Sequence, residues 1–139
     1  MTSRPGATAG IVLALASGAA PALAAVPESY GIWRNPKDSV HVQVKPCGQG
    51  ACGVVVWANE KAKADSLKGG TRELIGLTLF RNFVQGKDGL WRGRVFVPDL
   101  KGEFSGAAEV LDPKSIRAKG CAAGGLVCKS QVWKRIDAE

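Results

Sequence analysis

The chain has 139 residues and carries 19 Lys and Arg against 12 Asp and Glu, for a formal net charge of +7. This length fits a single domain and does not suit a multidomain architecture. The cations are scattered and form no basic stripe, so the charge suits solubility or contact with anionic surfaces and ligands. Nucleic-acid binding is not expected.

The first 24 residues have the three parts of a secretory signal peptide. Arg4 makes the start basic, an apolar and alanine-rich run begins at Ile11, and Ala22-Leu23-Ala24 is a small-x-small cleavage site. The apolar run is shorter than the ~20 residues that a membrane-spanning helix needs. We therefore predict export with cleavage after Ala24, one mature domain over residues 25–139, and no transmembrane segment.

From Pro27 onward the sequence alternates between strands and turns. Val40, Val42 and Val44 alternate with polar residues, which predicts a strand with one buried face. Asp88-Gly89 supplies the positive φ that a tight hairpin needs. The pattern predicts eight strands, at residues 29–34, 39–45, 52–58, 74–84, 90–97, 103–110, 115–120 and 129–136.

The polar stretch 59–73 interrupts this pattern and is predicted as a long loop, with at most one short helical turn at 61–67. The remaining strands follow one another at short spacing, which is typical of an all-β sandwich or barrel. A meander of eight strands closes most simply on itself, because closure removes the exposed edges. The predicted fold is an all-β, eight-stranded antiparallel up-and-down barrel.

Four cysteines in a small exported domain predict two disulfides. Cys47 and Cys52 flank one short turn, and Cys121 and Cys128 flank another. Hairpin pairing sets each pair opposite, near the ~5.5–6 Å Cα separation that a disulfide prefers, so we predict two local bridges. Zinc sites favour closer cysteines or histidines, and the one histidine, His41, is expected on the solvent face. We predict no metal, no redox centre and no cofactor.

The sequence contains no recognisable catalytic group. A nucleophilic triad needs a histidine beside its nucleophile, and His41 is expected to point outward. Glu103 and Glu109 share one predicted strand but lie ~20 Å apart, which is too far for a glycosidase pair. We therefore expect a protein that is not an enzyme.

The aromatic residues indicate how the barrel closes. Trp33 follows Gly31 in the first strand, and Arg135 lies on the same face of the last strand as Trp133. The first and last strands are neighbours in a closed barrel. We therefore expect Gly31, Trp33 and Arg135 to form the seam, with a cation–π contact of ~0.5–2 kcal/mol between Trp33 and Arg135.

A Gly-x-Trp in the first strand and an Arg ending the last resemble the lipocalin (calycin) motif. The wider strings "GIWRNP", "VQVKPCGQGACGVVVW", "LIGLTLFRNF", "LWRGRVFVPDLKGEFSG" and "GCAAGGLVCKSQVWKR" resemble the bacterial exported domain-of-unknown-function family 2147. The resemblance covers about residues 30–136. It implies a lipocalin-like barrel and a periplasmic location, and it implies no activity. The chain departs from the family at Phe96-Val97-Pro98, where Tyr-Asp-Pro is common, and at Lys68-Gly69-Gly70-Thr71, where Asn-Pro-Asp is frequent.

Two functional hypotheses follow. In the first, the barrel mouth binds a small, largely apolar molecule whose acidic end meets Arg94 or Arg135. Strand parity predicts that the ligand-binding residues are Trp33, Arg94, Phe96, Phe104, Gln131 and Trp133. In the alternative, the barrel is filled and its outside binds an envelope protein or an anionic envelope surface. An inner void of ~300 Å³ or more would favour the ligand-binding hypothesis, and a packed interior would favour the alternative. Inhibition of a lysozyme is disfavoured, because both proteins would be basic.

Overall fold

The computed structural model describes residues 2–3, 6, 8–15, 18 and 27–136 of the chain. The predicted cleavage site after Ala24 lies outside these described residues. Among them, no helix is long and apolar enough to span a membrane.

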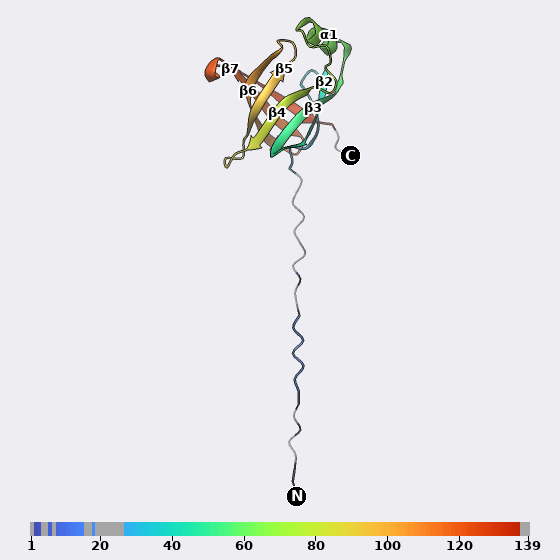
Figure 1. Ribbon diagram of the computed structural model, residues 1–139, viewed down its shortest axis with the longest axis vertical. Helices are drawn as coiled ribbons and strands as arrows, with labels where there is room; N and C mark the ends of the chain where they lie inside the picture. Colours follow the sequence, from blue (N-terminus) through green and yellow to red (C-terminus); the bar gives the residue numbers. More distant parts are fainter. Residues whose placement is uncertain (1, 4–5, 7, 16–17, 19–26, 137–139) are drawn as a thin grey trace.

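Eight antiparallel strands close into a barrel in sequence order, and β8 pairs with β1 to complete it (Figure 1). The strands are β1 (Gly31–Arg34), β2 (Val40–Cys47), β3 (Gly50–Ala58), β4 (Thr78–Gln85), β5 (Trp91–Val97), β6 (Gly102–Asp112), β7 (Ser115–Ala122) and β8 (Val127–Arg135). The predicted eight-stranded up-and-down barrel is confirmed. The predicted strand 74–84 is too long at its start, because residues 74–77 form a turn that hydrogen-bonds to Val55.

The predicted loop at 59–73 contains a helix, α1 (Glu60–Lys68), which is longer than the single turn expected. The Asn59 side chain caps the helix by accepting a hydrogen bond from the Ala62 amide at 2.8 Å. Lys61 and Asp65 form an i,i+4 pair, and Gly69 ends the helix. The helix has no continuous apolar face, so a search for hydrophobic periodicity missed it. A second, three-residue helix, η1 (Ala123–Gly125), forms the tip of the β7–β8 hairpin.

We call the two ends of the barrel the mouth and the base. The mouth carries α1, the β1–β2 turn, the β5–β6 turn and the tip of the β7–β8 hairpin, whereas the other three hairpins lie at the base (Figure 1). The two disulfides join Cys47 to Cys52 at the base and Cys121 to Cys128 near the mouth, which is the local pairing that was predicted.

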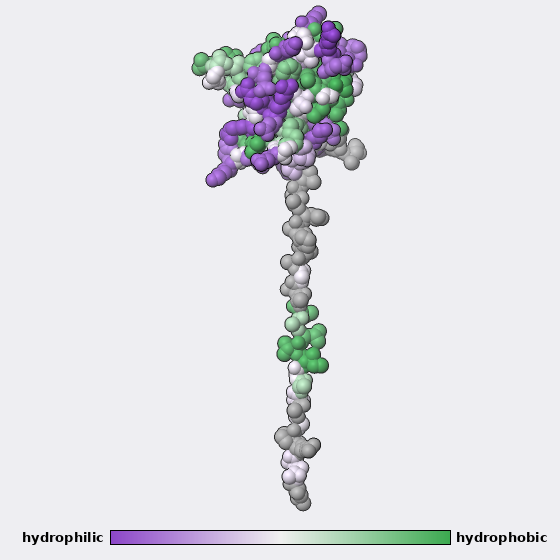
Figure 2. Space-filling model, in the orientation of Figure 1, coloured by the Kyte–Doolittle hydropathy of each residue, from purple (hydrophilic) through white to green (hydrophobic). Residues whose placement is uncertain are grey.

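The lower half of the barrel is filled by side chains. Its buried core includes Trp33, Val42 and Val55, and a cavity of only about 50 Å³ remains there. Glycines on the inner wall make room for aromatic rings. A Cβ added to Gly53 would lie 2.5 Å from the Phe80 ring and 2.7 Å from Val42. On the outside, Figure 2 shows a hydrophobic area over β3, where Val56 and Trp57 are exposed.

The first and last strands meet at a seam built around Trp33 and Arg135. The two residues are register partners, and the Arg135 guanidinium carbon lies 4.4 Å from the centroid of the Trp33 ring. Arg135 also donates to the backbone carbonyls of Tyr30 at 2.7 Å and Pro113 at 2.8 Å, and to that of Glu28. Gly31 begins β1 with a φ of 134°, a conformation that favours glycine.

Candidate functional site

The mouth of the barrel opens into a cleft of about 700 Å³. Its walls come from the β1–β2 turn, α1, the β5–β6 turn and the β7–β8 hairpin, so segments far apart in the sequence enclose it together. This volume exceeds the ~300 Å³ that separates a ligand-binding barrel from a filled one. The cleft therefore has enough space to hold a small molecule.

The floor of the cleft is aromatic. Trp133 of β8 and Phe80 of β4 meet edge to face, with ring centroids 5.4 Å apart and an interplanar angle of 75°. Both rings line the mouth cleft and also the small cavity below it, so they separate the open upper half from the filled lower half. Phe104, on the inner face of β6, adds a third ring to the cleft wall.

The β8 side of the cleft contributes two polar side chains next to the aromatic floor. Lys129 and Gln131 pair with Gly120 and Ala118 on β7, and by strand alternation they face inward like Trp133, which pairs with Ile116. Lys129 takes part in no ion pair within the described part of the chain, and it is exposed to the cleft. Gly120 leaves open space beside it, because a Cβ built there has no neighbour within 4 Å.

Helix α1 is fastened across one side of the mouth. The Thr71 hydroxyl donates to the Pro98 carbonyl at 2.9 Å, and Gly69 approaches Asp99 so closely that a Cβ would collide with its backbone. Asp65 also lines the cleft, and a hydrogen bond from Lys61 holds the pKa of its carboxyl below the ordinary range. This paired carboxylate therefore adds little net negative charge to the cleft.

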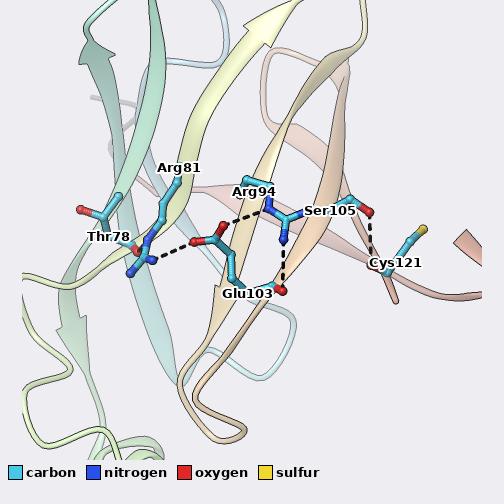
Figure 3. A network of polar contacts seen from close by, with 6 residues as sticks. All are labelled: Thr78, Arg81, Arg94, Glu103, Ser105 and Cys121. Atoms are coloured by element: carbon cyan, nitrogen blue, oxygen red, sulfur yellow. Dashed lines mark hydrogen bonds and ion pairs between the residues drawn. The ribbon is translucent and has the colours of Figure 1, made fainter. Parts of the chain in front are cut away.

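Arg94 does not line the cleft, contrary to the prediction. It lies on the outer wall, where its Nε donates to Glu103 at 2.9 Å while Arg81 donates to the same carboxylate at 3.0 Å (Figure 3). These hydrogen bonds, first from Arg94 and then from Arg81, lower the pKa of Glu103. Arg81 also stacks 4.6 Å from the centroid of the Phe96 ring. Arg94 thus belongs to a surface ion-pair network.

Trp33 does not line the cleft either. Its ring is 2% exposed and lies in the lower half of the barrel, where its Nε1 donates to the Ser29 carbonyl at 2.9 Å. Arg135 is at the same end, so neither predicted arginine reaches the mouth. The other four predicted residues, Phe96, Phe104, Gln131 and Trp133, all line the cleft.

Sequence reasoning missed Lys129, a cation on the inner face of β8 that lines the cleft. The pattern Lys129-x-Gln131-x-Trp133 puts the lysine on the same strand face as two residues that were predicted to line the site. This alternation was the sequence signal that could have identified Lys129.

The residues that the structure describes contain no group of three or more His, Cys, Asp or Glu that could hold a metal ion. His41 lies on the outer wall, 2.6 Å from Asp38 and stacked on Trp57.

Residues 31–135 match the model of the family described as "Uncharacterized protein conserved in bacteria (DUF2147)". This match covers every strand of the barrel. The chain belongs to the DUF2147 family. No curated protein and no solved structure matches the chain. The DUF2147 barrel closes like that of a lipocalin, with Trp33 and Arg135 at the seam, and the family description assigns no ligand to its mouth.

Proposed function

We propose that this DUF2147 protein is a non-catalytic binding protein of the bacterial periplasm. It takes one small, largely apolar molecule with an acidic end into the mouth cleft. The observation that supports this function best is the cleft itself, with about 700 Å³ of space above an aromatic floor. Small-molecule sites in proteins are concave, mostly apolar and about 300–1,000 Å³ in volume, with a few polar groups that fix orientation.

The polarity of the lining defines the ligand. An apolar body would pack on Trp133, Phe80 and Phe104, while an acidic end would meet Lys129 and accept a hydrogen bond from Gln131. A charge-assisted hydrogen bond between an ammonium and a carboxylate is about twice as strong as a neutral one. Its strength rises further when an apolar ligand displaces water from around it.

The periplasmic location is supported by the two disulfides. Bridges of this kind persist in oxidising compartments and are rare in the cytosol. The sequence-based signal peptide ending at Ala24 points to the same compartment.

The proposal is tested by calorimetric titration with dodecanoate and with dodecanol, which share the alkyl chain and differ in charge. Gly120→Leu should abolish binding of both, because it puts a side chain into the open space of the cleft at a position where a Cβ meets no neighbour. Ser130→Leu is the matched control. Ser130 pairs with Lys119 on the outward face of the same hairpin, so this variant should bind like the parent protein.

A second pair of variants tests the acidic end. Lys129→Gln should weaken dodecanoate binding by about tenfold and leave dodecanol binding unchanged, since only the carboxylate uses the charge. Lys45→Gln removes an equal charge from β2 at the base, and it should change the binding of neither dodecanoate nor dodecanol. If the parent protein binds neither alkyl compound, or if Gly120→Leu binds as well as Ser130→Leu, the mouth is not the ligand site. The filled-barrel alternative would then be the better description.

A further inference from the structure

The mouth end of the barrel carries three leucines that are unusually exposed. Leu67 at the end of α1 is 60% exposed, Leu100 in the β5–β6 turn is 68% exposed, and Leu126 at the tip of the β7–β8 hairpin is 88% exposed. These segments all surround the cleft opening, at the end of the molecule opposite to the base hairpins (Figure 1). Figure 2 shows the hairpin tip as a hydrophobic projection standing out from the barrel.

Each of the three segments that carry these leucines also carries a lysine. Lys68 follows Leu67, Lys101 follows Leu100, and Lys119 lies on the outer face of the hairpin that carries Leu126. In the portion of the chain that is described, none of these three lysines takes part in an ion pair. We call these six residues the mouth rim. Asp99, beside Leu100, is the carboxylate closest in sequence to the rim, and lysines flank it from both segments.

We propose that the mouth rim docks the protein onto an anionic phospholipid bilayer, with the cleft opening facing the lipid. Leucine side chains would enter the boundary between headgroups and acyl chains, while the lysines stay at the level of the phosphates. Lysines next to an anionic membrane surface add attraction that falls off within a Debye length. Each of the three segments carries an exposed leucine and a lysine, which meets both requirements.

The arrangement of the rim favours a lipid surface over a folded protein. The three leucines come from three separate segments and stand around an opening, so they form no continuous flat patch. A fluid surface accepts separated side chains at any spacing, whereas a protein partner needs a matching pocket for each one. The hydrophobic area over β3 is different, because Val56 and Trp57 are adjacent and only 40% and 42% exposed. A variant in the β3 area therefore serves as the control for a variant in the mouth rim.

Leu100 and Lys119 of the rim also border the cleft. The inference nevertheless goes beyond the proposed function, because it concerns the surface around the opening and not the space inside it. Docking does not need an occupied cleft, and ligand binding does not need a membrane. Gly120→Leu, which fills the cleft, should therefore bind vesicles like the parent protein. A parent protein that binds vesicles but neither alkyl compound would overturn only the proposed function. A parent protein that binds the alkyl compounds but no vesicle would overturn only this inference.

The test uses the full chain and two kinds of vesicle, phosphatidylcholine alone and phosphatidylcholine mixed with phosphatidylglycerol. Binding is measured by vesicle flotation, and far-UV circular dichroism checks that each variant is folded. The apolar residues 11–15 are present in every variant, so their contribution is common to all. We expect the parent protein to prefer the anionic vesicles and to lose this preference as salt is raised.

Two variant pairs then locate the contact. Leu126→Asp should lower binding to anionic vesicles by about tenfold, whereas Val56→Asp on the β3 wall should leave it unchanged. The double variant Lys68→Gln, Lys101→Gln should lower binding to anionic vesicles by about tenfold or more and leave binding to phosphatidylcholine vesicles unchanged. Its control is the double variant Lys45→Gln, Lys114→Gln at the base end, which should have a small effect on either kind of vesicle. If Val56→Asp removes binding and Leu126→Asp does not, the β3 wall is the contact and the inference is wrong.

A spectroscopic readout places the hairpin tip itself. The indole introduced by Leu126→Trp should be quenched by phosphatidylcholine brominated on its acyl chains, relative to the parent protein with its four native tryptophans. This signal reports depth at one site, whatever else holds the protein on the vesicle. A tip that stays unquenched while the protein is bound would overturn the proposed orientation.

Discussion

Replacing the buried Trp33 with alanine should destabilise this barrel more than replacing a tryptophan on its surface. The Trp33 ring is 2% exposed, its Nε1 donates to the Ser29 carbonyl at 2.9 Å, and Arg135 lies over its face at 4.4 Å. Truncating a buried tryptophan to alanine typically costs about 3–5 kcal/mol in unfolding free energy, because lost packing and a residual cavity add together.

The surroundings of Trp33 put the expected loss near the top of that range. The alanine variant leaves the Ser29 carbonyl without its indole donor, which adds roughly 1 kcal/mol to the loss of unfolding free energy. Arg135 keeps its hydrogen bonds to the Tyr30 and Pro113 carbonyls, so the seam between β1 and β8 weakens without being abolished. We expect a total of about 4–5 kcal/mol.

The assay is urea unfolding followed by far-UV circular dichroism, because tryptophan fluorescence would itself change with the substitution. With a slope of about 1.5 kcal/mol per M of urea, Trp33→Ala should lower the midpoint by about 3 M. Trp57→Ala is the control. Its ring is 42% exposed and stacks on His41, so the loss should stay within about 1 kcal/mol. A shift for Trp33→Ala within about 0.5 M of the parent value, or no larger than that for Trp57→Ala, would refute this reasoning.

Three further predictions concern the barrel wall and its charges. Gly53→Ala should cost about 1–3 kcal/mol in thermal or urea unfolding, because its Cβ would overlap the Phe80 ring, while Gly120→Ala should be close to neutral. Reducing both disulfides should remove about 2–2.5 kcal/mol for each short loop and leave the far-UV β signal in place; complete loss of that signal would mean that the bridges are needed for folding. NMR titration should give Glu103 a pKa below its ordinary 4.5, so its stabilising contribution is present above that pH and is lost as the pH falls through the lowered value. Arg94→Gln should raise that pKa, and an unchanged titration would contradict the hydrogen-bonded network.

Local patterns in the sequence were sufficient for the fold and for the disulfides. Valines alternating with polar residues define strands, and each cysteine pair flanks a turn short enough to form a bridge within one hairpin. Helix α1 escaped prediction because its support is an Asn59 cap and a Lys61–Asp65 pair, which stabilise a helix without any apolar stripe.

The site was only partly predictable, because alternation along a strand assigns two faces without saying which one is inside. Phe104, Gln131 and Trp133 were assigned to the correct face. Arg94 was not, because the prediction took the opposite parity for β5. This strand alternates regularly, with Val95 opposite the inward Phe104 and Arg94 opposite Ser105 on the outer face. Lys129 shares the inner face with Gln131, so the same alternation that placed Gln131 would have placed it too.

Height along the barrel axis is the other quantity that a single strand does not specify. The sequence by itself determined that Trp33 and Trp133 are both inward and that Trp33 lies beside Arg135. Only the closed sheet decided that Trp33 fills the lower half while Trp133 forms the floor of an open cleft. The reason is physical: alternation and turn chemistry act between near neighbours in the chain, whereas depth depends on how all eight strands are staggered when the barrel closes.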